Sequence, residues 1–208
     1  MCRRHRREGC CVSRTEVRIT GFGGQGVVLA AYIIGRACSV FGGKHATMTQ
    51  SFGPEARGAA CSATQIISDT EVLYPYIVRP DILIVMSSDG YDTYRDELKD
   101  DGILIYEKDL VHPILKKRQP SFGIPSTRIA ESLGRTIVQN IVMIGFFGAV
   151  TQIVSREALR KGVEASVPPG TEELNLKAFE AGLAYFDDEY GKKKTKKPAK
   201  AAAAGKSD

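Results

Sequence analysis

The sequence feature that most constrains the fold is a glycine motif set between a short strand pattern and an apolar helix pattern. Residues 17–26 read VRITGFGGQG, in which Gly21, Gly23 and Gly26 form a G-x-G-x-x-G motif. The sixteen residues that follow, VVLAAYIIGRACSVFG, contain a single charge. A strand before and a helix after the glycines are the context in which such a motif wraps a phosphate. The segment therefore predicts a β-turn-α unit able to bind a nucleotide.

The expected guest of this loop is a phosphate or a pyrophosphate. Glycine lets the backbone approach a ligand closely, and the first N–H groups of the helix, with the helix dipole, favour an anion. Gln25 adds a side-chain amide beside these donors. A tight turn that holds no ligand is the alternative.

The nucleotide is further constrained by the absence of a ribose ligand. An NAD site places Asp or Glu about twenty residues after the glycine motif. The sequence reads KHATMTQSFG in that region and has no acidic residue before Glu55. This pattern disfavours NAD and favours a nucleotide held mainly by its phosphates. Coenzyme A fits, because its adenosine carries a 3′-phosphate and a pyrophosphate.

Strand and helix patterns alternate along the chain, and residues 82–86 form an apolar run, ILIVM, typical of a parallel strand buried on both faces. Alternation predicts an α/β fold that is Rossmann-like, with a largely parallel sheet and helices on both faces. The expected strands are residues 16–20, 45–50, 62–68, 80–87, 102–107 and a short extended piece at 120–126. The expected helices are residues 26–41, 89–99, 127–134 with Ser126 as N-cap, 137–154, one starting after Ser155, and 175–190.

Two of these helices are apolar on all sides. The segment at 26–41 carries one charge, and the segment at 137–154 carries none. A sheet covers only one side of a helix, so the other side needs a further cover. Another subunit is the favoured cover, and packing within the monomer is the alternative.

Residues 136–155 are long enough to span a bilayer, but their Gln and Asn side chains favour a buried helix of a protein without a membrane span.

Charge divides the chain into a body and two tails. The formal net charge is +5, but residues 1–14 carry +4 and residues 191–208 carry +6, which leaves the body at −5. A nucleic-acid-binding face would need positive charge on the folded body, so no nucleic-acid partner is expected. We predict a disordered basic tail at 1–14, one domain at 15–190 and a disordered Lys/Ala-rich tail at 191–208.

The five cysteines make no C-x-x-C pair, and three of them lie within the first eleven residues. Iron–sulfur and structural zinc sites usually need close cysteine pairs, so no metal centre is expected in this chain.

No apolar signal-peptide core follows the basic start, which favours a cytoplasmic protein. The body has only two histidines, and neither has a neighbour that would make it a base, so no catalytic residue is assigned.

A second loop, TQSFGPEARGAA at residues 49–60, is slim and holds Glu55 and Arg57 as opposite charges in an uncharged surrounding. These two residues form either a local ion pair or a site at which Arg57 presents its planar fork to a phosphate or a carboxylate.

Together with SDTEVLYPYIVRPDILIVMS at 68–87, the motifs GFGGQG and TQSFGPEARGAA resemble the gamma subunit of the 2-oxoacid:ferredoxin oxidoreductases. The resemblance covers about residues 17–185 and is strongest to the 2-oxoglutarate branch of that family.

The resemblance implies a subunit of a larger enzyme that is not active alone. Alpha and beta subunits would hold thiamine diphosphate and an iron–sulfur cluster, electrons would pass to ferredoxin, and coenzyme A would take the acyl group to form succinyl-CoA. The gamma chain would contribute to coenzyme A binding. The family's motif residues correspond here to Gly21, Phe22, Gly23, Gly24, Gln25, Gly26, Ser51, Glu55, Arg57 and Asn140.

Two other functions remain open on the residues alone. One is a free-standing dehydrogenase with a Rossmann-like nucleotide domain, which would need a ribose-binding acid and a general base. The other is a scaffold subunit whose glycine loop is vestigial.

Overall fold

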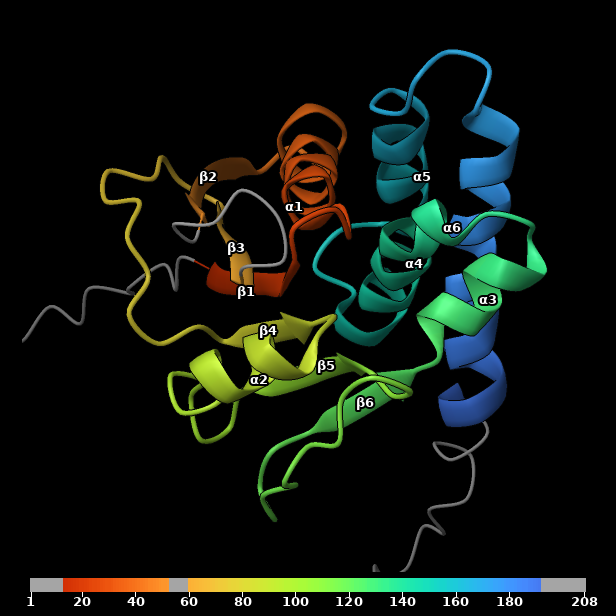
Figure 1. Cartoon of the computed structure of the whole chain (residues 1–208). Coiled ribbons are helices and arrows are strands. Elements are labelled where there is room, and N and C mark those ends of the chain that lie inside the picture. The colour runs from red at the N-terminus through yellow and green to blue at the C-terminus, as the bar shows by residue number, and fades with distance from the viewer. Residues whose placement is uncertain (1–12, 53–59, 192–208) are drawn as a thin grey trace, which may run out of the picture.

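A six-stranded sheet forms the centre of the computed structural model, which describes residues 13–52 and 60–191 (Figure 1). The strand order is β2-β3-β1-β4-β5-β6. The strands are β1 (Arg14–Phe22), β2 (His45–Phe52), β3 (Ala60–Ser68), β4 (Ile82–Val85), β5 (Ile103–Glu107) and β6 (Ser121–Ile124).

The sheet is parallel over β1, β4, β5 and β6, and antiparallel where β3 joins β1 and β2 joins β3. The expectation of a largely parallel sheet is confirmed, and the hairpin of β2 and β3 at one edge is the exception. Only residues 53–59 connect these two strands. A parallel pair needs a crossover of a dozen or more residues, so this short connection makes the pair antiparallel.

Five helices lie on one face of the sheet, two of them against the strands and three packed on those two, and one short helix lies on the other face (Figure 1). The first group is α1 (Val27–Arg36), α3 (Ser126–Ser132), α4 (Gln139–Thr151), α5 (Arg156–Glu164) and α6 (Glu172–Phe186), and the second face carries α2 (Ser88–Tyr94). A π-helical turn, Ala37–Phe41, extends α1 over the predicted range, and a second π-helical turn, Asp187–Gly191, extends α6. A 3-10 turn, Thr136–Val138, precedes α4. Helix α2 is shorter than expected, and α6 begins three residues earlier than expected.

The core has two unequal parts because side chains of a strand alternate between its faces. Ile82 and Ile84 of β4 join the large cluster under the five helices, whereas Leu83 and Val85 join a small cluster under α2. All four residues of β4 are buried, as the apolar run predicts for a strand covered on both sides.

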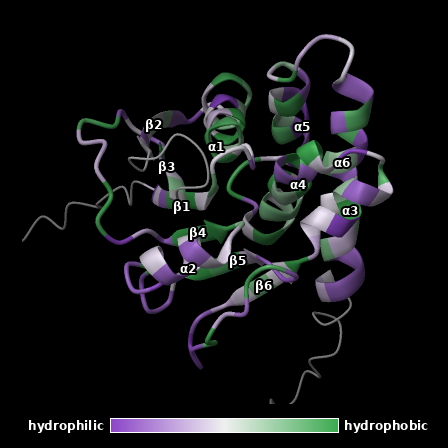
Figure 2. Cartoon of the chain, in the orientation of Figure 1, coloured by the Kyte–Doolittle hydropathy of each residue, from purple (hydrophilic) through white to green (hydrophobic). Residues whose placement is uncertain are grey.

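Helix α4 is covered within the chain, so the favoured expectation that a partner covers it is wrong. Ten of its residues are buried, and it packs against α6, α5, α3 and α1. Figure 2 shows the hydrophobic residues of α4 enclosed by these helices. Helix α1 differs, because Leu29 and Tyr32 stay exposed, as does Val40 in the turn that follows.

Two glycines allow α4 and α6 to pack backbone against backbone. A Cβ on Gly145 of α4 would collide with the carbonyl oxygen of Phe179, and one on Gly182 of α6 would collide with that of Val142. No described helix is long and apolar enough to cross a membrane.

The start of α3 differs from the expected cap. Ser126 is the first helical residue, and its hydroxyl donates to the buried carboxylate of Glu107. The same carboxylate oxygen accepts the N–H of Thr127 at 3.0 Å. Glu107, which is distant in sequence, therefore takes the capping role that the local pattern assigned to Ser126.

The contact between α4 and α6 predicts a position-specific effect of alanine. Gly145→Ala places a methyl group against a backbone carbonyl, and we expect a loss of about 1–3 kcal/mol of unfolding free energy. Gly148→Ala on the same helix is the matched control, because its Cβ would meet only the end of the Leu159 side chain. Thermal denaturation should show a clearly lower Tm for Gly145→Ala than for Gly148→Ala. Equal Tm values would contradict the close backbone contact.

Candidate functional site

The glycine loop, residues 21–26, leaves the carboxyl end of β1 and enters α1. Gly24 has φ +101° and Gly26 has φ +75°, both in the region that L side chains rarely adopt. Gly23 and Gly24 are exposed, and a Cβ on Gly24 would meet no atom within 4 Å. The chain therefore reverses direction here through backbone conformations that favour glycine, and the loop presents its backbone at an open surface.

This loop lies at the point where the chain changes faces of the sheet. Strands β1 and β4 are parallel neighbours, but α1 follows β1 onto one face and α2 follows β4 onto the other (Figure 1). The carboxyl ends of two such strands form a crevice in which α/β proteins bind their ligands. The loop and residues 86–88 after β4 lie side by side at this switch point, joined by a hydrogen bond between Gln25 and Met86.

The start of α1 is suited to an anion. Its N-cap is Gly26, which has no side chain to cap the helix, and the first turn contains no acidic residue. The first N–H groups of a helix have no partner inside it, and the helix dipole adds partial positive charge there.

Gln25 stabilises the loop from within. Its side-chain oxygen accepts the N–H of Phe22 at 2.7 Å, and its side-chain nitrogen donates to the carbonyl of Met86 at 3.0 Å. We expected this amide to stand beside the backbone donors that face a ligand. In the structure its oxygen and its nitrogen both bind backbone groups of the protein. Through Phe22 and Met86, the amide joins the glycine loop to the residue that follows β4.

Asn140 also supports the loop. It is the second residue of α4, is only 2% exposed, and donates from its side-chain nitrogen to the carbonyl of Gly26 at 3.3 Å. A Cβ on Gly26 would collide with this amide. The structure therefore brings Asn140 to the glycine loop, as expected, but its side chain is buried between the loop and the core.

Ser51 lies on a different part of the sheet. The register places Ser51 beside Ser62 and Ser62 beside Thr20, so Ser51 is two strands from β1, about 10 Å away. Its side chain shares the α2 face of the sheet with Arg18, in a hollow of about 260 Å³ rich in hydroxyl groups. Asn140 lies on the other face. Glu55 and Arg57, the other two expected residues, lie outside the described residues.

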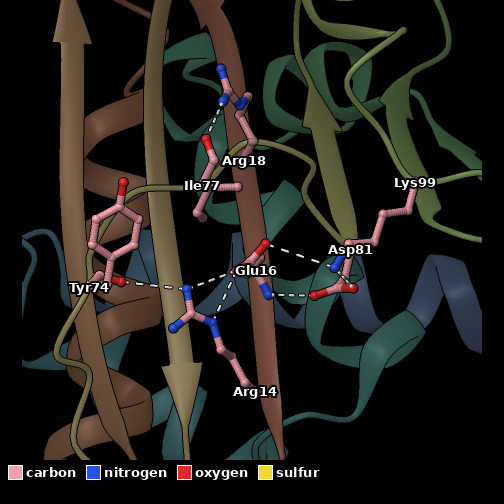
Figure 3. A network of polar contacts seen from close by, with 7 residues as sticks. All are labelled: Arg14, Glu16, Arg18, Tyr74, Ile77, Asp81 and Lys99. Carbon is pink, nitrogen blue, oxygen red and sulfur yellow. Dashed lines mark hydrogen bonds and ion pairs between the residues drawn. The ribbon is translucent and has the colours of Figure 1, made fainter.

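Polar contacts at the amino end of β1 fix β4 beside it (Figure 3). The N–H of Glu16 donates to the Asp81 carboxylate at 2.8 Å, and Lys99 binds the same carboxylate at 2.7 Å. Arg14 and Arg18 donate to the backbone carbonyls of Tyr74 and Ile77, each at 3.5 Å. These contacts hold the irregular segment that leads from β3 to β4.

The tertiary structure also changes where an acidic ribose ligand would lie. The strand at 45–50, which comes next after the glycine motif in the sequence, is β2 at the edge of the sheet and does not adjoin β1. The parallel neighbour of β1 is β4, and the first acid after it is Asp89, exposed in the first turn of α2. Sequence spacing could not find Asp89, because the hairpin displaces the neighbouring strand by about forty residues.

No activated nucleophile accompanies the loop in the described part of the chain. Cys61 lies opposite Gly21 on β3, and burial raises the pKa of its thiol. Burial likewise raises the pKa of the Cys38 thiol to about 12. Both cysteines are thiols at neutral pH and poor nucleophiles. Over residues 13–52 and 60–191, no three His, Cys, Asp or Glu side chains gather as a metal site.

Fold and loop together define an α/β protein with a phosphate-type glycine loop at the switch point of its sheet. The chain belongs to the pyruvate ferredoxin/flavodoxin oxidoreductase family, whose sequence model matches residues 16–185. The resemblance seen in the motifs is thereby confirmed.

Curated relatives cover most of the chain. A 2-oxoglutarate synthase subunit KorC of Methanothermobacter thermautotrophicus is 49% identical over 176 residues, which are 81% of this chain and 93% of the relative. A pyruvate synthase subunit PorC of the same organism is 37% identical over 84% of this chain and 96% of its own length.

Solved structures are similar as well. The gamma subunit of a keto/oxoacid ferredoxin oxidoreductase from Geobacter sulfurreducens has a TM-score of 0.76 and 38% identity, over 83% of this chain and 95% of its own. A 2-oxoglutarate:ferredoxin oxidoreductase from Magnetococcus marinus, solved with 2-oxoglutarate, coenzyme A and succinyl-CoA, has a TM-score of 0.75. It is 19% identical, over 82% of this chain and 30% of its own, and supports the fold alone.

The role of Gln25 predicts that its two substitutions differ. Gln25→Ala removes both hydrogen bonds, at about 0.5–1.5 kcal/mol each, and should lower the Tm. Gln25→Glu keeps an acceptor for the Phe22 N–H but places a carboxylate against the Met86 carbonyl. Hydrogen exchange at the Phe22 amide should therefore speed up in Gln25→Ala and stay slow in Gln25→Glu. Unchanged exchange in Gln25→Ala would show that the side chain does not hold the loop.

Proposed function

We propose that this chain is the gamma subunit of a 2-oxoglutarate:ferredoxin oxidoreductase. The observation that carries the proposal is the difference in identity between relatives of nearly equal coverage. The relative named as a 2-oxoglutarate synthase subunit is 49% identical, whereas the one named as a pyruvate synthase subunit is 37% identical.

The proposed reaction is the oxidative decarboxylation of 2-oxoglutarate with coenzyme A, which gives succinyl-CoA, carbon dioxide and reduced ferredoxin. Alpha and beta subunits would carry thiamine diphosphate and the iron–sulfur cluster, and the complex would be cytoplasmic. Thiamine diphosphate supplies the decarboxylation chemistry when bound. Within this chain, residues 15–190 would form the working domain, between tails at 1–14 and 191–208.

This chain's part is to bind and orient coenzyme A. The exposed backbone of Gly23 and Gly24 and the uncapped start of α1 offer N–H donors at the carboxyl end of β1, which suits a pyrophosphate. Gln25 and Asn140 hold that backbone in place, so they act as positioning residues. Ser51, Glu55 and Arg57 are proposed to contact coenzyme A beyond the glycine loop.

The family argues against a free-standing dehydrogenase, and the two relatives compared above are themselves named as subunits. A scaffold role with a vestigial loop is disfavoured by the exposed backbone of Gly23 and Gly24 beside a helix start that has no side-chain cap.

Reconstitution tests the whole proposal. The chain, co-expressed with its alpha and beta partners, should purify with them and reduce ferredoxin in the presence of coenzyme A faster with 2-oxoglutarate than with pyruvate. Faster reduction with pyruvate would refute the substrate, and failure to co-purify would refute the subunit role.

The cofactor assignment makes Gly24 the most informative residue. Gly24→Val puts a β-branched side chain on the exposed loop at a positive φ, which should block the approach of a phosphate. The KM for coenzyme A should rise strongly, while reduction of the cluster by the 2-oxoacid alone should persist. Gly134→Val is the matched control, because Gly134 has a similar φ of +92° and equally open surroundings. An unchanged coenzyme A dependence in Gly24→Val would mean that the loop is only a turn.

Arg57 provides a second test of the same assignment. If its guanidinium binds a phosphate, Arg57→Ala should remove a charge-assisted contact of about 1.5–3 kcal/mol. The affinity for coenzyme A should then fall about tenfold to a hundredfold. Arg156→Ala is the control for net charge, since Arg156 pairs with Asp187 at the surface of α5. Equal affinities in calorimetric titrations of the two variants would rule out the contact.

A further inference from the structure

The edge strand β2 leaves one side of its backbone unpaired within the described residues. Its eight residues pair with β3 in a continuous register from His45 to Phe52, and no other described strand lies beside it. Such an edge presents a row of N–H and C=O groups that can pair with another extended chain.

The opposite edge of the sheet is protected. Strand β6 has only four residues, and the Tyr190 hydroxyl both accepts from the N–H and donates to the carbonyl of Gly123, each at 3.1 Å. The backbone of the β6 edge is therefore partly hydrogen-bonded by a side chain, whereas that of the β2 edge is not paired with any described strand on its outer side.

The sequence of β2, HATMTQSF, contains none of the usual devices that block an edge. It has no Lys, Arg, Asp, Glu or Pro, its register with β3 shows no bulge, and His45 at its first position is its only titratable residue. Proteins commonly protect free edges with charges, prolines and bulges. A strand of this length without them is suited to being paired.

A groove beside β2 supports this interpretation. It has a volume of about 360 Å³ and lies between α1, with the turn that follows it, and β2. Tyr32 and Val40 stand at this groove with 49% and 63% of their surfaces exposed. At its floor Gln65 is 1% exposed, and its side-chain oxygen has no hydrogen-bond partner among the described residues. The groove is thus incompletely covered in the single chain.

We propose that β2 pairs with β2 of a second copy of this chain, antiparallel across a two-fold axis. The occupant must offer an extended, uncharged backbone edge, and β2 itself has one. Two-fold symmetry requires the same patch on both copies, and an uncharged strand meets that requirement without placing like charges opposite each other.

The alternation of side chains restricts the register. Facing residues of a continuous sheet share a face, so their numbers must have the same parity. An axis through any residue of β2 meets this condition, and we take the one at Met48, near the middle of the strand. It places Met48 against Met48 and Ala46 against Gln50 on the groove face, and Thr47 against Thr49 on the other face. Threonine pairs of this kind stabilise neighbouring strands.

The first test is the mass of the full-length chain in solution. The wild-type chain, 22.6 kDa, should show twice that mass by light scattering at micromolar concentration. Gln50→Lys adds a charge to the exposed edge and should return the mass to that of one chain. Ser121→Lys on the protected strand β6 is the matched control and should remain a dimer. A wild-type monomer, or a dimer that survives Gln50→Lys, would overturn the proposal.

The second test reads the register directly. In a chain whose Cys2, Cys10 and Cys11 are replaced by serine, Met48→Cys should form a disulfide between copies under mild oxidation, because opposite Cβ atoms lie about 4.5–5.5 Å apart. Gln50→Cys is the control, since its two copies would be four residues out of register, about 13 Å apart. Equal cross-linking of the two variants would refute the pairing. Neither outcome bears on coenzyme A binding, so this inference can fail while the proposed function stands.

Discussion

The position of β1 inside the sheet is the constraint on which the candidate site depends. This strand pairs antiparallel with β3 on one side and parallel with β4 on the other. Its parallel partner sends α2 to the opposite face from α1, which makes the carboxyl ends of these two strands the switch point of the sheet. The contacts of Glu16 and Lys99 with Asp81 hold β4 in that place. A glycine loop at the end of an edge strand would not lie at such a switch point.

The packing of α4 on α6 connects the core to this loop. Gly145 and Gly182 let the two backbones approach, so α4 sits deep between the other helices and the sheet. Its first turn then reaches the glycine loop, where Asn140 binds the carbonyl of Gly26. A polar side chain is stable in this buried position because its amide is hydrogen-bonded there. Core packing and loop position are thus parts of one arrangement.

The loop itself divides its polar groups between support and presentation. The side chains of Gln25 and Asn140 form hydrogen bonds with backbone groups of the protein, whereas Gly23 and Gly24 expose backbone without side chains. A site built in this way offers directed N–H groups and little chemistry of its own. Such a site suits a chain that binds one part of a substrate while partner chains carry the reacting groups.

The sequence by itself determined the local units: the glycine loop between strand and helix, the buried apolar runs of β4 and α4, and the motifs that identify the family. These features depend on neighbours in the chain, so residue patterns reveal them. Only the tertiary structure decided that β2 and β3 form an antiparallel hairpin, that α4 is covered by α6, and that Glu107 caps α3. It also separated Ser51 from Asn140 across the sheet and turned Gln25 inward. Each of these outcomes depends on a partner distant in the sequence, and the period of a strand or a helix carries no record of that partner.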